Sequence, residues 1–172
     1  MMFFHREYET LANIPHYTGN QYVDELMATA KSLAVPGKGI LASDESTGTI
    51  GNRFSSIGVE NTHDNRIAYR SLLFHAPEIE NYISGAILYD ETARDSDESG
   101  KKFVELLAEK NIIPGIKIDI GMSTIQGTKD ETATMGLDGM NERAREYYAM
   151  GIRFAKWRAV IKIDEKTGCP SD

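Results

Sequence analysis

The sequence has 172 residues, of which 41% are hydrophobic and 26% charged, and its formal net charge is −7 at pH 7. This composition excludes disordered and fibrous chains, and the acidic balance disfavours binding to nucleic acid. No apolar run reaches the roughly 18 residues of a membrane span, and the start lacks the apolar core of about 7–15 residues of a signal peptide. A single cysteine, Cys169, excludes an internal disulfide framework. We therefore expect a cytoplasmic protein whose partner is neither nucleic acid nor a membrane.

Residues 1–21 show no clean periodicity and are interpreted as an N-terminal arm. From residue 22 onwards, apolar spacing predicts alternating elements. Helices are expected over about 24–35, 49–57, 63–75, 99–110 and 141–150, buried strands over 39–44, 83–89, 112–119 and 152–163, and loops over 92–100 and 121–139. The proline at position 114 suggests that the third strand begins late, near Gly115. Four strand–helix repeats predict an α/β fold with parallel strands and helical crossovers, although a complete eight-stranded barrel typically needs about 250 residues.

Charged residues inside two of these strands are unusual, because buried parallel strands normally read as continuous apolar runs. Lys117 and Asp119 are two positions apart, as are Lys156 and Arg158, so each pair shares one face of its strand. Charge on one face and apolar bulk on the other fits a barrel whose interior holds a polar site. The alternative for each pair is a structural ion pair, such as one between Lys117 and Asp119.

Two carboxylates follow strands at the end where barrel active sites lie. Asp44 and Glu91 could each act as a general acid or base, or orient a lysine. Alternatively, Glu91 is a loop carboxylate facing solvent, and Asp44 or Ser46 only caps the following helix.

The basic residues Arg53, Lys117, Lys156 and Arg158 indicate an anionic ligand such as a phosphate. A lysine crowded by other cations can become a nucleophile, so Lys156 or Lys117 is a candidate for a Schiff base. Neither a dinucleotide fingerprint nor a phosphate-binding P-loop occurs. The four histidines lack metal-ligand spacing, and we expect His63 to begin a helix; no metal or cofactor is predicted.

Six ordered segments resemble the class I fructose-bisphosphate aldolases, and together they cover about residues 22–170. These segments are 37–48, 60–62, 84–88 with 91–92, 113–119, 136–139 and 154–158. The sequence departs from the family at Ser43, where alanine is usual, and at Ile120, where many members have lysine. Residues 89–95 and 122–134 also diverge.

This resemblance implies the N-terminal half of a (β/α)8 TIM barrel, with four parallel strands and flanking helices over residues 22–172. The family consists of lyases of glycolysis and gluconeogenesis that cleave fructose 1,6-bisphosphate into dihydroxyacetone phosphate and glyceraldehyde 3-phosphate. They work through a lysine Schiff base, without metal or cofactor, usually as homotetramers. A small-molecule sugar phosphate is therefore the implied partner.

Carried over by motif, the resemblance implies catalytic roles for Asp44 and Lys156. It implies substrate-binding roles for Arg53, Arg66, Lys117, Lys156 and Arg158. In the family the Schiff-base lysine lies on the sixth strand and the acid–base glutamates on the fifth, beyond the four predicted strands. We therefore expect a truncated chain that is inactive alone. The alternatives are a non-catalytic half-barrel that binds sugar phosphate or assembles with a partner, and another phosphosugar lyase or isomerase.

Overall fold

The computed structural model describes residues 21–128 and 130–163. All but the last residue of the expected N-terminal arm, and Cys169, lie outside the described residues. The helices are α1 (Val23–Leu33), α2 (Thr47–Ser55), α3 (His63–Phe74), α4 (Asp90–Arg94), α5 (Phe103–Glu109) and α6 (Met140–Ala149), with a 3-10 turn, η2 (Ile79–Asn81). The strands are β1 (Gly39–Ser43), β2 (Ile83–Leu88), β3 (Ile113–Lys117), β4 (Met122–Thr124), β5 (Thr132–Thr134) and β6 (Phe154–Lys156).

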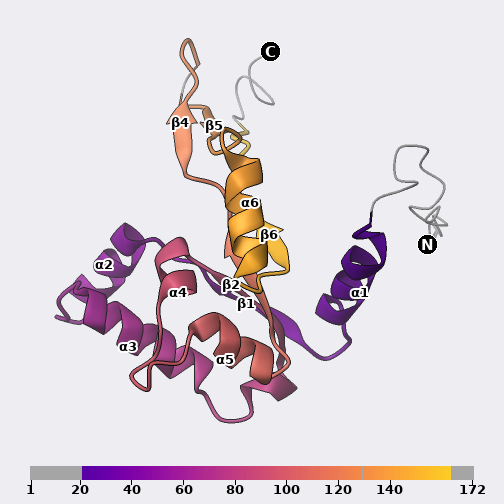
Figure 1. The fold of residues 1–172 in the computed structure, drawn as a ribbon. Coiled ribbons are helices and arrows are strands. Elements are labelled where there is room, and N and C mark those ends of the chain that lie inside the picture. The colour runs from indigo at the N-terminus through magenta and orange to yellow at the C-terminus, as the bar shows by residue number, and fades with distance from the viewer. Residues whose placement is uncertain (1–20, 129, 164–172) are drawn as a thin grey trace, which may run out of the picture.

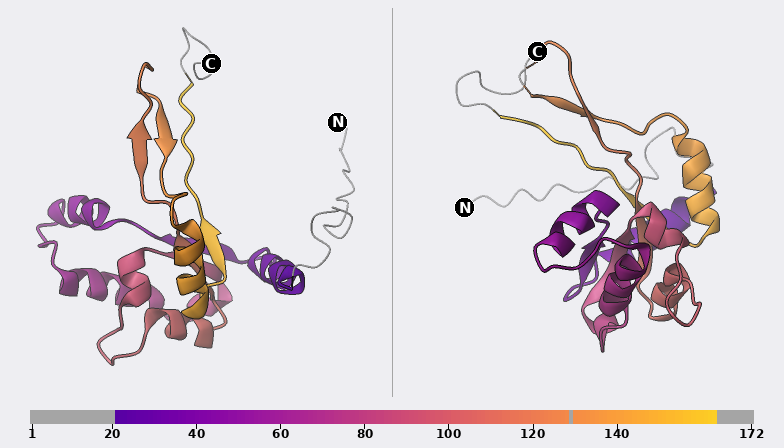
Figure 2. Two further views of the ribbon diagram at one scale, coloured as in Figure 1. Left: turned by 45° about the horizontal axis from the view of Figure 1, so that its top comes forward. Right: turned by 90° about the vertical axis from the view of Figure 1, so that its left-hand side faces the viewer.

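Four strands form one parallel sheet in the order β1-β2-β3-β6, which confirms the predicted fold class. Helices α3, α4 and α5 gather on one side of this sheet, while α1 stands apart from them (Figure 1). The β4–β5 hairpin projects away from the sheet in every view (Figures 1 and 2). Within the described part of the chain, no helix is both long and apolar enough to cross a bilayer.

The two faces of the sheet differ in burial because only one of them is covered by the clustered helices. On the covered face, Leu88 and Ile116 pack with helix residues into a core whose buried members include Phe74, Phe103 and Leu107. The alternate residues along the strands, such as Ile87, Lys117 and Lys156, are only partly buried. The period-2 alternation expected for strands thus separates a helix-facing apolar side from an open side that carries charge.

Two glycines let side chains approach the open face near the starts of the strands. A Cβ on Gly115 would lie 2.3 Å from Cζ of Phe154, and one on Gly85 would lie 2.5 Å from Cδ2 of Leu33. The carbonyl of Leu33 also accepts a hydrogen bond from the Ser84 hydroxyl at 2.8 Å. The end of α1 and the first residue of β6 therefore fill this end of the open face.

Several sequence expectations were wrong in detail. The expected loop over 92–100 begins inside α4, which buries Thr92 and Ala93, and the expected loop over 121–139 contains the β4–β5 hairpin. Both elements are short and polar, so they carry no long apolar period. Helix α5 begins at Phe103, later than expected, and β3 already begins at Ile113, with Pro114 inside it. The carbonyl of Pro114 accepts a hydrogen bond from the Arg153 N–H at 2.9 Å. The proline lacks only the N–H donor of an ordinary strand residue.

The outer strands also differ from expectation. Strand β1 was expected to be buried, but Ile40 is 46% exposed, because β1 lies at an edge of the sheet and pairs only with β2. Strand β6 was expected to run from 152 to 163 and spans three residues. Its partner β3 ends at Lys117, and the N–H of Arg158 then donates to the Asp119 side chain instead of a neighbouring strand.

Candidate active site

A cleft of about 760 Å³ opens at the carboxyl ends of the parallel strands. Four of the six residues to which the resemblance assigns a catalytic or substrate-binding role line it: Asp44, Lys117, Lys156 and Arg158. They come from β1, β3 and β6 or from the residues just after them, which is the end where sites occur in barrels of parallel strands. The structure thus brings together residues that are up to 114 positions apart along the chain (158 − 44).

An ion pair joins the two outer strands across this cleft. The Nζ of Lys156 lies 2.7 Å from Oδ2 of Asp44, and their side chains are 33% and 12% exposed. Because β1 and β6 are the opposite edges of the sheet, this contact requires a strongly curved sheet. The Asp44 carboxylate thereby accepts from a lysine rather than capping α2; the hydroxyl of Ser46 is the cap and accepts from the Thr49 N–H at 3.4 Å.

Asp119 organises the neighbouring part of the cleft. It accepts from Nζ of Lys117 at 2.6 Å, from the Gly121 N–H at 3.2 Å and from the Arg158 N–H at 3.3 Å. Burial would raise the pKa of Asp119, but the Lys117 hydrogen bond and charge, with the two N–H donors, outweigh burial and hold that pKa below its usual value. The structural ion pair weighed from the sequence therefore exists, and Lys117 nevertheless lines the cleft.

Both lysines considered as nucleophiles from the sequence donate to carboxylates in the structure. Nucleophilic attack requires a neutral amine with a free lone pair. An ammonium group that donates to Asp44 or Asp119 is instead suited to stabilise negative charge on a ligand.

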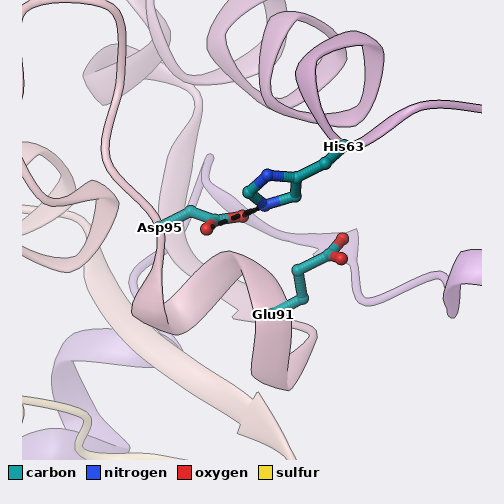
Figure 3. A group of neighbouring side chains, drawn as sticks. All are labelled: His63, Glu91 and Asp95. Carbon is teal, nitrogen blue, oxygen red and sulfur yellow. Dashed lines mark hydrogen bonds and ion pairs between the residues drawn. The ribbon is translucent and has the colours of Figure 1, made fainter.

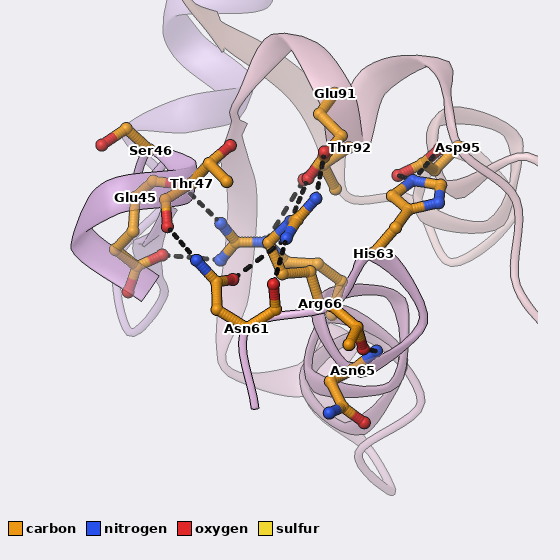
Figure 4. Close-up of polar contacts among 12 residues, drawn as sticks. Glu45, Ser46, Thr47, Asn61, His63, Asn65, Arg66, Glu91, Thr92 and Asp95 are labelled. Carbon is orange, nitrogen blue, oxygen red and sulfur yellow. Dashed lines mark hydrogen bonds and ion pairs between the residues drawn. The ribbon is translucent and has the colours of Figure 1, made fainter. Parts of the chain in front are cut away.

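Arg53 and Arg66 lie outside the residues that line the cleft. Arg53, on α2, has a side chain that is 57% exposed and donates to Glu45, which does line the cleft. Arg66, on α3, forms a two-pronged contact with Glu91, with Nε–Oε1 and Nη2–Oε2 distances of 2.7 and 2.8 Å (Figure 4). The Arg66 hydrogen bond, opposed by burial, lowers the pKa of Glu91. The expected roles of Arg53 and Arg66 in substrate binding therefore stay predictions.

His63 begins α3 as expected and lies beside Glu91 and Asp95 (Figure 3). Its Nε2 is 3.0 Å from both carboxylate oxygens of Asp95. Ligand atoms of the three residues lie within 4.8 Å of one another, but both oxygens of Glu91 already accept from Arg66. The guanidinium charge opposes a second cation at this position, so the arrangement is that of an ion-pair network.

The cleft contains a carboxylate that the sequence reasoning passed over. Asp90, rather than Glu91, faces the cleft, where it accepts from the Tyr147 hydroxyl at 2.9 Å and from Nε of Arg94 at 3.0 Å. Burial, reinforced by the hydrogen bond to Asp90, raises the pKa of Tyr147 to about 12. The available signal was position, since Asp90 stands two residues after the end of β2 and Asp44 stands one residue after the end of β1.

Comparison with known proteins identifies the family of the chain. The family model "Fructose-bisphosphate aldolase class-I" matches residues 25–172. Fructose-bisphosphate aldolase 1 of Toxoplasma gondii is 57% identical over 148 residues, which are 86% of this chain and 41% of the relative. The cytosolic fructose-bisphosphate aldolase 5 of Arabidopsis thaliana is 57% identical over 143 residues, 83% of this chain and 40% of the relative.

A solved structure of fructose-bisphosphate aldolase from Plasmodium falciparum, in a complex with TRAP and a small-molecule inhibitor, superposes with a TM-score of 0.84 at 52% identity. The match covers 87% of this chain and 43% of that one. The chain therefore spans about two fifths of the length of the relatives it matches. The family model matches most of the chain, and the four-stranded parallel sheet carries charged residues at the ends of its strands. The chain therefore belongs to the class I fructose-bisphosphate aldolase family.

Proposed function

We propose that this chain supplies the anion-binding and proton-handling side of a fructose 1,6-bisphosphate aldolase site of glycolysis and gluconeogenesis. The reaction is the cleavage of that substrate into dihydroxyacetone phosphate and glyceraldehyde 3-phosphate through a lysine Schiff base. The observation that carries the proposal is the Asp44–Lys156 contact across a cleft that Lys117 and Arg158 also line.

The chemistry of these side chains fits a phosphorylated sugar. Lys117, Lys156 and Arg158 offer positive charge and hydrogen-bond donors to phosphate and hydroxyl oxygens. Asp44 offers a carboxylate that can take up the proton released when an amine adds to the ketone, and can return it to the carbinolamine hydroxyl that leaves as water. Lys156 stabilises the charge that develops beside it. To contact a phosphate, Arg53 would have to release Glu45 and turn its exposed side chain, and Arg66 would have to release Glu91.

Binding is tested by nuclear magnetic resonance titration of the 172-residue chain with fructose 1,6-bisphosphate, and with fructose as the uncharged control. Shifts are expected at cleft residues for the bisphosphate alone. Lys156→Met should weaken the affinity roughly 10–100-fold, the effect of losing one hydrogen bond to a charged group. Arg145→Met, which removes an exposed arginine of α6, is the matched control and should leave the affinity unchanged. Shifts spread evenly over the surface, or equal for fructose, would contradict the proposal.

We further propose that the 172 residues bind this substrate without turning it over, because the two lysines of the cleft that were candidates for the nucleophile are both held by carboxylates. Borohydride treatment in the presence of dihydroxyacetone phosphate should leave every lysine unmodified by mass spectrometry. A reduced adduct on Lys156 or Lys117 would reject this part and assign the nucleophile to that residue.

A second candidate, a half-barrel that assembles with a partner, is favoured by the open face and the exposed edge strand β1. A defined dimer in sedimentation velocity that binds no sugar phosphate would favour it over the aldolase proposal. For the aldolase proposal we expect the family's homotetramer. We also expect the cytoplasmic location that the pea and chickpea relatives carry in their names, although an Arabidopsis relative is named chloroplastic.

A further inference from the structure

Arg70 on α3 is buried, and the proposed function gives it no role. Its side chain is 4% exposed, and arginine is rarely fully buried unless it is paired. Nη1 donates to Oε2 of Glu45 at 2.6 Å, Nη2 to the main-chain carbonyl of Glu45 at 2.9 Å, and Nε to the hydroxyl of Thr92 at 3.2 Å. Arg70 thus donates hydrogen bonds to both the side chain and the backbone of Glu45.

Glu45, the residue that Arg70 binds, is the immediate neighbour of Asp44. Glu45 lies between Asp44 and the N-cap residue Ser46, in the turn that joins β1 to α2. Strand β1 ends at Ser43, so pairing with β2 no longer orients the backbone at Asp44. The carbonyl contact to Arg70 holds the Glu45–Ser46 peptide unit, and the carboxylate contact holds the Glu45 side chain. With Glu45 fixed at both groups, the backbone on the C-terminal side of Asp44 is constrained, and with it the direction of the Asp44 carboxylate.

The same carboxylate of Glu45 also reaches Arg53. One oxygen accepts from buried Arg70 and the other from exposed Arg53 (side chain 57% exposed). Arg70 therefore fixes a residue that follows Asp44 directly in the chain and pairs with Arg53, two of the positions predicted to handle substrate. Figure 4 labels Glu45 and Thr92, the two residues to which Arg70 donates.

We propose that Arg70 is a positioning residue that holds Asp44 against Lys156 through Glu45. The consequence for catalysis rests on the proposed function, but the geometric claim does not. Without Arg70, the turn at residues 44–46 would lose its buried anchor, and the Asp44–Lys156 contact, which spans the open cleft between the two edge strands, would loosen.

The test measures how fast an acylating reagent modifies Lys156 in the whole chain, by mass spectrometry. Acylation requires the amine to reach the reagent with its lone pair, so a lysine whose Nζ is engaged by a carboxylate, as Lys156 is by Asp44, reacts slowly. Asp44→Asn defines the rate without the carboxylate. Arg70→Met and Arg70→Lys are expected to raise the Lys156 rate about fivefold, the factor for losing a hydrogen bond of ordinary strength. Lysine is included because it cannot reproduce the forked contact of arginine.

A merely structural role for Arg70 is separated from positioning by the reference sites. Lys31, on α1, should keep its rate in every variant, and Arg145→Met should leave Lys156 unchanged. If Arg70→Met does not fold, the proposal is judged from Arg70→Lys and Thr92→Val. The second variant removes only one acceptor of Arg70. A Lys156 rate equal to wild type in folded Arg70→Lys and Thr92→Val would overturn the proposal, as would an equal rise at Lys31.

Substrate binding supplies a second arm. In a double-mutant cycle, Arg70→Lys should weaken fructose 1,6-bisphosphate binding when Asp44 is present and have no further effect in Asp44→Asn. If wild type does not bind the bisphosphate while Lys156 acylation still depends on Arg70, the proposed function fails and the positioning role stands. Additive effects on affinity would reject positioning through Asp44.

Discussion

The substitution Asp119→Asn tests the electrostatic centre of the cleft, because it removes the charge of a carboxylate and keeps its size. The Asp119 side chain is 2% exposed, and its partner Lys117 is 18% exposed. Asparagine can still accept from the N–H groups of Gly121 and Arg158. The change therefore isolates the contact with Lys117, whose ammonium would lose its opposite charge.

The expected loss of stability follows from that geometry. Breaking a fully buried ion pair by removing one partner costs about 3–5 kcal/mol, whereas a hydrogen bond to a charged group contributes about 1.5–3 kcal/mol. Lys117 keeps some contact with water and its second acceptor, the carbonyl of Asp119 at 3.0 Å. We therefore expect a loss of about 2 kcal/mol in the free energy of unfolding at pH 7.

Urea unfolding at a series of pH values measures this loss, with Glu98→Gln, at an exposed loop carboxylate, as the control. The pKa of Asp119 is lowered in the folded chain, so its stabilisation is complete above the ordinary aspartate value of about 3.9 and is lost as the pH falls through the folded value. The gap between wild type and Asp119→Asn should be constant from about pH 5 to 8 and narrow below about pH 4. A gap that closes between pH 5 and 8, or one no larger than that of Glu98→Gln, would refute the reasoning.

Two further substitutions test the packing and the capping that support the site. Leu107→Ala removes a fully buried side chain of α5 and should lower the free energy of unfolding by about 2–5 kcal/mol. Its control, Leu72→Ala, at a position 73% exposed, should change that free energy by less than about 0.5 kcal/mol. Equal losses in the two variants would contradict the assigned core. Thr62 caps α3 through a 3.2 Å hydrogen bond from the Asn65 N–H, so Thr62→Ala should cost about 1 kcal/mol and Thr62→Ser much less. Thermal unfolding followed by circular dichroism measures both comparisons, and an equal loss in the alanine and serine variants would reject the cap.

Helices and parallel strands were largely predictable because their signals are local. The start of α3 at His63 and the end of α6 before Gly151, which adopts a φ of 98°, follow from neighbouring residues alone. Lys156 and Arg158 both line the cleft, but the strand face predicted for them was wrong, because β6 ends at Lys156 and Arg158 lies beyond it. Short polar elements such as α4 and the β4–β5 hairpin carry no such signal, and they were missed.

The partners of the charged side chains depended on the tertiary structure. From the sequence, only Glu91 was considered as the acid after the second strand, and the start of α4 at Asp90 turns Asp90 to the cleft and Glu91 to Arg66. The hydrogen bonds of Arg70 to Glu45 join positions 25 residues apart. No pattern in the sequence predicted them.

The sequence by itself determined the α/β class, the alternation of helices with parallel strands, and the presence of charged residues at the strand ends. These features follow from the spacing of apolar and charged residues over short segments. Only the tertiary structure decided which charges meet. Asp44 and Lys156 stand 112 positions apart, on opposite edges of the sheet, and no local pattern brings them within 2.7 Å. That contact depends on the curvature of the sheet, which arises from the packing of the strands and helices together.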